Sequence, residues 1–400
     1  MWTISRRVIL AVAAALLTPA WSLAQDITLS GQVRPRTEYR DPSSATGERQ
    51  AWTTLRTRIA ATWQSTGPVQ AFIQLQDVRF FGEEASTLGD YQADNFDLHQ
   101  GWLEVGAPTS LAALRVGRQE AVYGGQRLIG AVNWTQQGRS FDGARLRLRP
   151  NDAFQVDLLG FQLWESASPA RDVDATLWGA YGVWTPADDR TLDLFTLRQE
   201  TALDAGDTDQ WTAGLRYVAR DGGFDYRLEG AWQTGERTGQ DVSAFLLGAR
   251  AGRSFADGRA GLTLWFDYLS GTEPGSDEVG AFETLFATNH KFYGYADLFL
   301  DIPTHTAGRG LVDLAVKGRL QITDDWGVNL DVHRFSVAED GGLSSGDLGT
   351  EIDLTLTRAL FHGLRVSGGA AFVLAGDALG PVRGIDDDVT FAYVMLDLVF

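Results

Sequence analysis

Apolar and polar residues alternate with a period of two along most of the chain. In the segment 224–233 one face carries Phe224, Tyr226, Leu228 and Trp232, and the other carries Asp225, Arg227, Glu229 and Gln233. An amphipathic helix would place apolar residues three and four positions apart, and none of the alternating segments shows that spacing. The pattern therefore predicts β-strands that each have one apolar and one polar face.

About 18 such segments follow one another. They begin near residues 27, 51, 69, 97, 111, 140, 154, 176, 191, 210, 224, 242, 261, 311, 328, 348, 364 and 390. Spans of about ten residues suit tilted strands that cross an apolar band of about 25 Å. The sequence thus predicts an all-β fold, a single-chain antiparallel transmembrane β-barrel of about 18 strands over residues 25–400.

Polar stretches separate the segments and differ in length. Short ones, such as 150–152 and 221–223, predict tight turns. Longer ones predict surface loops at 40–50, 82–96, 165–175, 271–310 and 336–347. The longest, 271–310, is a candidate lid or plug. Because an even number of strands returns the chain to its starting side, both termini are expected at the periplasmic end.

The final segment favours a closed barrel. Its apolar face carries Ala392, Val394, Leu396, Leu398 and Phe400, so the chain ends on an aromatic residue. An open edge strand with this face would invite aggregation, whereas a closed barrel pairs it with the first strand. Aromatic residues near the segment ends suit the interfacial girdles of membrane barrels. They are Trp63, Trp102, Tyr217, Trp232, Phe335 and Phe400.

The N-terminal residues predict export across the inner membrane. Arg6 and Arg7 precede an apolar run over 8–17, and small residues follow at 22–24. This order is typical of a secretory signal peptide, here residues 1–24, and the run is too short for a membrane-spanning helix. Together with the strand pattern, it predicts a protein of the bacterial outer membrane.

Composition excludes several classes of function. The chain has 52 acidic and 34 basic residues, a formal charge of −18 and no cysteine. A nucleic-acid-binding protein would carry a basic surface, and a disulfide scaffold or thiolate metal site would need cysteine. The mean hydropathy of −0.14 excludes a bundle of membrane helices. No cofactor and no resident metal are implied, although Asp386, Asp387 and Asp388 form either a solvated acidic loop or a calcium loop.

The polar faces of the segments predict a charged lumen. Arginines gather in the first third, at Arg34, Arg36, Arg56, Arg58, Arg145 and Arg147, and acidic residues interleave mainly in the second half. Guanidinium groups bind carboxylates through two parallel hydrogen bonds, so these arginines are candidates for binding an anionic substrate. The alternative is electrostatic bracing, in which arginines and acids pair with one another and bind no ligand.

Two blocks of sequence resemble the alginate-export family of outer-membrane barrels. The first comprises GRQE at 117–120, YGGQRLIG at 123–130, NW at 133–134 and RSFDG at 139–143. The second comprises FETLF at 282–286, NHKFYG at 289–294 and Asp297. The resemblance implies an 18-stranded barrel that passes the anionic exopolysaccharide alginate through an arginine-lined pore. It adds Arg118, Arg127, Arg139 and Lys291 to the candidate pore residues, with Asp142 and His290 as candidate bracing or constriction partners.

Three functional hypotheses follow from these observations. The first is an outer-membrane channel for an anionic, alginate-like polysaccharide or oligosaccharide, monomeric and with periplasmic export components as candidate partners. The alternative is a general or small-solute uptake porin. The third is an outer-membrane hydrolase, which would need a serine or aspartate beside a histidine. The five histidines show no such motif, and His290 has no serine next to it in the sequence.

Overall fold

Eighteen strands form the computed structural model, which describes residues 26–42, 47–83, 96–107, 109–165, 174–202 and 206–400. The strands are β1 (Asp26–Asp41), β2 (Gln50–Gln64), β3 (Val69–Phe80), β4 (Phe96–Val105), β5 (Ala112–Gln119), β6 (Phe141–Asn151), β7 (Phe154–Glu165), β8 (Asp174–Ala187), β9 (Arg190–Ala202), β10 (Thr208–Asp221), β11 (Phe224–Arg237), β12 (Gln240–Phe255), β13 (Ala260–Leu269), β14 (Leu311–Gln321), β15 (Trp326–Ser336), β16 (Asp347–Phe361), β17 (Leu364–Ala375) and β18 (Val389–Val399). Each begins within two residues of the position expected from the alternation. The predicted signal peptide lies outside the described residues.

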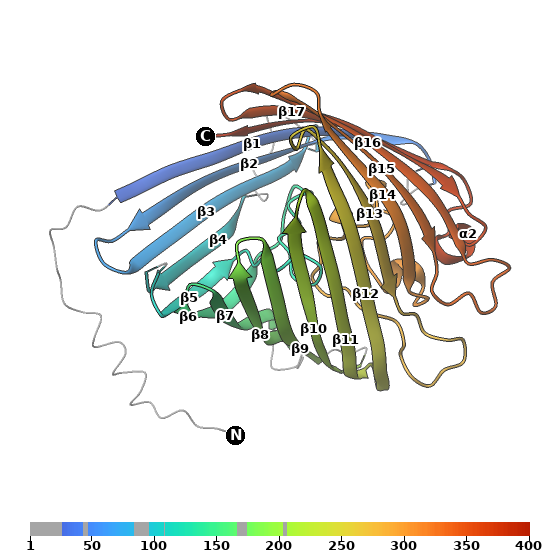
Figure 1. Cartoon of the computed structure of the whole chain (residues 1–400), viewed down its shortest axis with the longest axis horizontal. Coiled ribbons are helices and arrows are strands. Elements are labelled where there is room, and N and C mark those ends of the chain that lie inside the picture. The colour runs from blue at the N-terminus through green and yellow to red at the C-terminus, as the bar shows by residue number, and fades with distance from the viewer. Residues whose placement is uncertain (1–25, 43–46, 84–95, 108, 166–173, 203–205) are drawn as a thin grey trace.

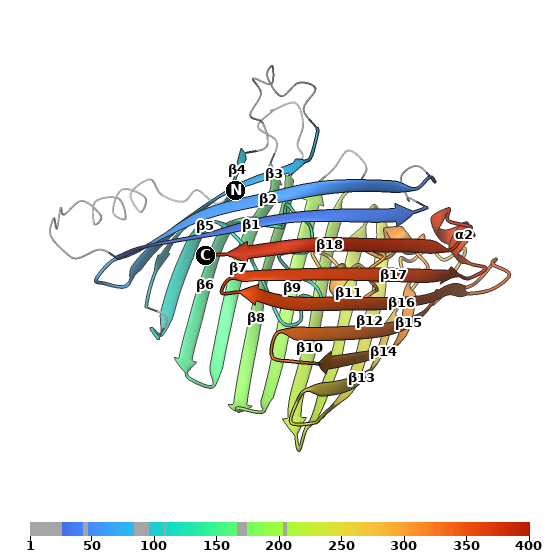
Figure 2. The ribbon, with the colours of Figure 1, turned by 90° about the horizontal axis from the view of Figure 1, so that it is seen from above.

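The strands close into one antiparallel barrel, which confirms the predicted fold. Every strand pairs with its neighbours in sequence, and β1 pairs with both β2 and β18 (Figures 1 and 2). At the seam, Gly31 N–H donates to Phe400 O at 2.7 Å and Phe400 N–H donates to Gly31 O at 3.1 Å. The C-terminal strand is therefore paired on both sides, as its apolar face predicted.

Tight turns join the strands at one end of the barrel, called here the turn end. Gly222 and Gly223 join β10 to β11 with φ of 55° and 84°, values that suit the type I′ turn of a hairpin. Most connections at the opposite end, the loop end, are longer. They contain two single-turn helices, η1 (Asn289–Lys291) and η2 (Thr304–Thr306), and the short helix α2 (Leu379–Arg383). No helix among the described residues has the length and apolar character needed to cross a membrane.

The two faces of the wall differ as the alternation predicted. On β11, Leu228 and Trp232 are 54% and 60% exposed and point outward, whereas Glu229 and Gln233 are buried inside the barrel. An apolar exterior of this kind suits the hydrocarbon of a bilayer, and a polar interior suits a hydrated lumen.

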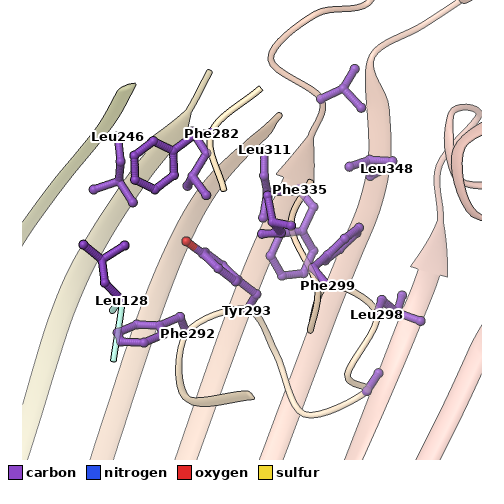
Figure 3. Packing of buried hydrophobic residues seen from close by; sticks show 14 of the residues in the cluster. Leu128, Leu246, Phe282, Phe292, Tyr293, Leu298, Phe299, Leu311, Phe335 and Leu348 are labelled. Carbon is purple, nitrogen blue, oxygen red and sulfur yellow. The ribbon is translucent and has the colours of Figure 1, made fainter. Parts of the chain in front are cut away.

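Two long connections fold into the barrel at the loop end and are called here the inner segments 120–140 and 270–310. Figure 3 shows their apolar side chains packed against the wall, with Leu128 and Phe282, Phe292, Tyr293, Leu298 and Phe299 meeting Leu246, Leu311, Phe335 and Leu348. This apolar cluster lies inside the barrel, where the sequence predicted a uniformly polar face. The inner segments bury it, so it is shielded from water.

Two residues assigned to the aromatic girdles lie inside the barrel. Phe335 is 1% exposed and packs edge-on against Phe299, with ring centroids 4.9 Å apart, and Trp102 stacks on Phe72 at 5.3 Å. The girdle prediction is therefore wrong for Phe335 and Trp102. Their position near a strand end was correct, but alternation places them on the inward face of the strand.

Candidate functional site: the lumen and its inner segments

Four arginines of β1 and β2 form a patch on the inner wall. Arg34, Arg36, Arg56 and Arg58 are only 2–6% exposed, because the inner segment 120–140 covers them. They donate to backbone carbonyls of residues 133–137. The bonds are Arg34 Nη1 to Asn133 O at 2.7 Å, Arg36 Nη1 to Trp134 O at 2.5 Å, Arg56 Nη1 to Thr135 O and Gln136 O at 3.3 Å each, and Arg58 Nη2 to Gln137 O at 3.2 Å.

These bonds supply hydrogen-bond donors to backbone carbonyls of a segment that pairs with no strand. Residues 133–137 run irregularly inside the barrel, and irregular backbone at membrane depth is tolerated only where its polar groups find partners. The guanidinium groups supply those partners. The four arginines that the sequence placed together on the wall are thus brought together, and the donors named above bond to protein atoms.

The inner segments are joined to each other by an aromatic stack. Trp134 lies parallel to His290 with ring centroids 4.1 Å apart, and the Arg36 guanidinium lies 4.2 Å above the Trp134 ring. Asp297 accepts from Trp134 Nε1 at 3.2 Å and contacts His290 Nδ1 at 2.6 Å. His290 is therefore held between an aromatic ring and a carboxylate, an arrangement that braces the segments.

Arg127 connects the inner segment 120–140 to the opposite wall. Its guanidinium lies 2.7 Å from Asp267, 3.2 Å from Glu229 and 2.6 Å from the Tyr293 hydroxyl. Burial by itself would lower the pKa of Arg127, but Asp267, Tyr293 and Glu229 outweigh it and raise the pKa. Arg127 therefore carries a permanent charge that is already paired.

Arg145 and Arg147 of β6 are also paired. Arg147 Nε lies 2.9 Å from Asp157, which is fully buried, and Arg145 Nη2 lies 3.2 Å from Glu104. Both arginines face inward, as the alternation predicted, and both contribute to bracing across neighbouring strands.

Arg118 lies elsewhere. On β5 it shares the outward face with Leu114 and Val116, which are 43% and 50% exposed. Its Nη1 lies 2.6 Å from Asp142 Oδ2, and both side chains are substantially exposed. Because alternation turns position 118 away from the lumen, Arg118 and Asp142 form an ion pair on the outer face of the barrel, and Arg118 is no pore residue in this structure.

Arg139 and Lys291 have no carboxylate partner within the described part of the chain. Arg139 Nη1 donates to Ala287 O at 3.3 Å, and Lys291 Nζ donates to Gly125 O at 3.4 Å. Burial lowers the pKa of both side chains, and the nearby guanidinium groups of Arg227, Arg216 and Arg250 lower that of Lys291 further. Neither cation therefore forms an ion pair with a described residue, although Glu229 lies near enough to Lys291 to act on its charge.

The tip of the inner segment 270–310 is bound to two wall carboxylates. Glu351 accepts the Ala296 N–H at 2.7 Å, and Asp353 accepts the Tyr295 N–H at 3.3 Å. On the other side, Arg40 of β1 donates to the Ala296 carbonyl. The tip is therefore fixed between β1 and β16, a contact that no spacing in the sequence could reveal.

The fold also brings together a serine, a histidine and a glutamate. Ser140 Oγ lies 3.5 Å from His99 Nδ1, and His99 Nε2 lies 2.8 Å from Glu120 Oε1. Arg58 contacts the same Glu120 oxygen at 3.5 Å. A serine nucleophile normally stands within about 3.2 Å of its base, so this longer contact, with its shared carboxylate, fits bracing of the inner segment better than catalysis. Among the described residues, no three side chains of His, Asp or Glu converge to hold a metal ion.

Comparison with known families gives one match. A family model described as alginate export matches residues 25–302. No curated protein matches the chain by sequence.

The fold is similar to those of several solved barrels. OpdO of Pseudomonas aeruginosa is 15% identical with a TM-score of 0.67, over 94% of this chain and 97% of that one. OccK8 (OprE) of the same species is 13% identical with a TM-score of 0.65, over 94% and 98%. OccAB4 of Acinetobacter baumannii is 9% identical with a TM-score of 0.63, over 96% and 100%. At these identities the likeness concerns the fold alone.

Proposed function

We propose, because this chain belongs to the alginate-export family, that it passes an anionic, alginate-like polysaccharide or oligosaccharide through its lumen. The chain is a channel of the bacterial outer membrane, and the proposal concerns what the channel carries. It makes the protein a transporter and not an enzyme. A closed barrel leaves no strand edge for a partner, so a monomer is proposed as the working unit.

One observation carries the proposal: the lumen holds basic side chains that form no ion pair within the described part of the chain. Arg139 and Lys291 on the inner segments, and Arg227 on β11, have no ion pair with any described residue, in a chain whose overall charge is −18. Cations exposed along a pore attract a carboxylate at each step and bind it weakly enough to release it. A neutral sugar could accept hydrogen bonds from these groups but would lack the charge-assisted contact that a carboxylate makes.

The inner segments supply selectivity in this proposal. Segment 270–310 runs from the apolar cluster at the loop end to Glu351 on β16, and in this proposal it narrows the lumen as a lid or plug. Segment 120–140 narrows the lumen from the side of β1 and β2. The unpaired Lys291 and Arg139 lie on these two segments, where a passing anion would meet them.

Block of current by uronate oligomers tests the proposal. The refolded protein is placed in a planar bilayer, and alginate oligomers are added at constant ionic strength, with neutral maltooligosaccharides of equal length as the control. The proposal expects concentration-dependent block by the uronates and at least tenfold weaker block by the neutral sugars, about 1.4 kcal/mol. Equal block by both would contradict it.

A second candidate is a porin for small solutes. One observation favours it: the inner segment 120–140 covers the wall arginines and fills part of the lumen through which a polymer would have to pass. The covered arginines are Arg34, Arg36, Arg56 and Arg58. A current carried by small anions that added oligomers do not block would identify this function.

A further inference from the structure

A groove lies on the outer face of the barrel, away from the lumen. Its volume is about 930 Å³, and it is lined mainly by outward-facing side chains of β10–β15. Ala249 and Ala251 of β12 form its floor, because each stands between longer side chains on the two neighbouring strands. The flanking residues are Leu228 and Tyr226 on β11 and Phe266 and Leu264 on β13.

Arg253 continues the floor of this groove toward the turn end. It is the next outward position on β12 after Ala251, about 6–7 Å farther along the strand. Phe224 of β11 lies directly opposite it, and the guanidinium carbon of Arg253 lies 4.8 Å from the centre of the Phe224 ring and 5.3 Å from that of Phe255. A basic side chain on the lipid face costs little only near the membrane interface. Arg253 therefore belongs at the level of the lipid headgroups, with the apolar groove beside it.

Arg253 differs from outward-facing arginines at the loop end, because it has no carboxylate partner. It is exposed and makes only ring contacts, with no ion pair or hydrogen bond to any residue that the structure describes. Its charge is therefore available to an anion from outside the protein. Three outward arginines near the loop end are instead neutralised by the protein: Arg118 by Asp142 at 2.6 Å, Arg198 by Asp209 at 2.8 Å and Arg334 by Asp347 at 2.6 Å.

We propose that the groove and Arg253 form a binding site for an anionic glycerophospholipid. One acyl chain lies over Ala249 and Ala251, and the headgroup phosphate lies at the Arg253 guanidinium. The site is on the outer face of the barrel, so it does not depend on what the channel carries.

The position and the charge of Arg253 select this occupant. Short turns face the periplasm in outer-membrane barrels, so Arg253 meets the headgroups of the periplasmic leaflet. A basic side chain at a membrane surface attracts anionic lipids, and a guanidinium group matches two phosphate oxygens through parallel hydrogen bonds. The groove faces the hydrocarbon of the same leaflet, where an acyl chain fills the space that the two alanines leave.

Lipid binding by the refolded protein tests the site. Protein in a neutral detergent is titrated with phosphatidylglycerol, and bound lipid is counted by native mass spectrometry, with phosphatidylcholine of the same acyl chains as the zwitterionic probe. Arg253→Gln should weaken phosphatidylglycerol binding by about fivefold, roughly 1 kcal/mol, and phosphatidylcholine binding by less. Ala251→Trp, which fills the floor of the groove, should weaken the binding of both lipids.

Arg358→Gln is the matched control. Arg358 of β16 also faces outward near the turn end, and its guanidinium carbon lies 5.0 Å from the centre of the Trp326 ring. It has no ion pair with a described residue, but it lies on β16, outside the strands β10–β15 that line the groove. Its replacement should leave lipid binding unchanged.

The outcomes separate a site from general attraction of lipid to the barrel. Weaker binding in Arg253→Gln and Ala251→Trp, with Arg358→Gln unchanged, supports the site. An equal loss in Arg253→Gln and Arg358→Gln overturns it, as does a wild-type protein that retains no phosphatidylglycerol. A dimer that Ala251→Trp abolishes would assign the groove to a second copy of the chain and would also overturn the lipid site. Should Ala251→Trp lack the heat-modifiable gel mobility of a folded barrel, Ala249→Phe carries the same test.

Discussion

The contacts of each inward-facing arginine decide what that arginine can do. Arg34 and Arg56 donate to carbonyls of 133–137, Arg127 and Arg147 pair with buried carboxylates, and Lys291 meets only a neutral carbonyl. The sequence could identify all of these as inward or family positions, but it could not tell a paired cation from a free one. That difference depends on inner segments far away in the chain, and it separates bracing from substrate contact.

Replacing Arg56 should loosen the inner segment 120–140. Arg56→Gln is expected to leave the Gln136 carbonyl without its donor and the Thr135 carbonyl with Arg34 alone, at a cost of about 1–3 kcal/mol. The barrel should remain folded, and single-channel recordings should show larger and noisier current. Arg198→Gln, on the exposed outer side of β9, should record like the wild type; quiet, unchanged current in Arg56→Gln would contradict the anchoring role.

Lys291 should make anion selectivity sensitive to alkaline pH. Burial and neighbouring arginines lower the pKa of Lys291 below the ordinary 10.5, so the charged form, which attracts anions, is lost at lower pH than for a free lysine. The zero-current potential in a salt gradient should therefore move toward zero as pH rises through this lowered pKa. Lys291→Arg should remove the change, because arginine stays charged; an identical pH profile in this variant would exclude Lys291.

At the scale of elements, the alternation of apolar and polar residues predicted where the strands lie, but it did not predict the apolar residues that point inward at the loop end. Each strand start was predicted within two residues, because one face meets lipid and the other meets the lumen. Phe335 and Leu246 broke this rule, since they are apolar yet point inward against Phe299 and Phe282. Only the folded path of 270–310 makes an apolar inward face favourable, and periodicity carries no information about where a long connection goes.

Shortening one buried side chain of the inner segment 270–310 should detach this segment from the barrel wall while the barrel stays folded. Phe299→Ala removes a ring that is 1% exposed and packs on Phe335, a change that costs about 3–5 kcal/mol in a packed core. We expect higher conductance and faster proteolysis within 270–310, with the gel mobility of a folded barrel retained. Leu300→Ala, at a 38% exposed neighbouring position, should change neither quantity. Equal behaviour of the two variants would show that this packing does not hold the segment.

At the scale of the whole molecule, charge is divided between the lumen and the rest of the chain. The protein carries −18 overall, but Arg139, Arg227 and Lys291 face the lumen without carboxylate partners among the described residues. The net charge therefore did not predict the charge of the lumen, and the arginine clusters in the sequence predicted it only in part. In the proposed function these local cations, and not the total charge, set the selectivity of the channel.

The zero-current potential of the wild-type protein in a tenfold KCl gradient shows whether these local cations govern selectivity. In a planar bilayer at neutral pH, we expect a potential of the sign that marks preferential chloride passage. Lys291→Gln should reduce it, and Arg190→Gln, at a 55% exposed side chain of the turn end, should leave it unchanged. A potential of the opposite sign would show that the acidic residues govern the lumen, and would contradict an anion channel.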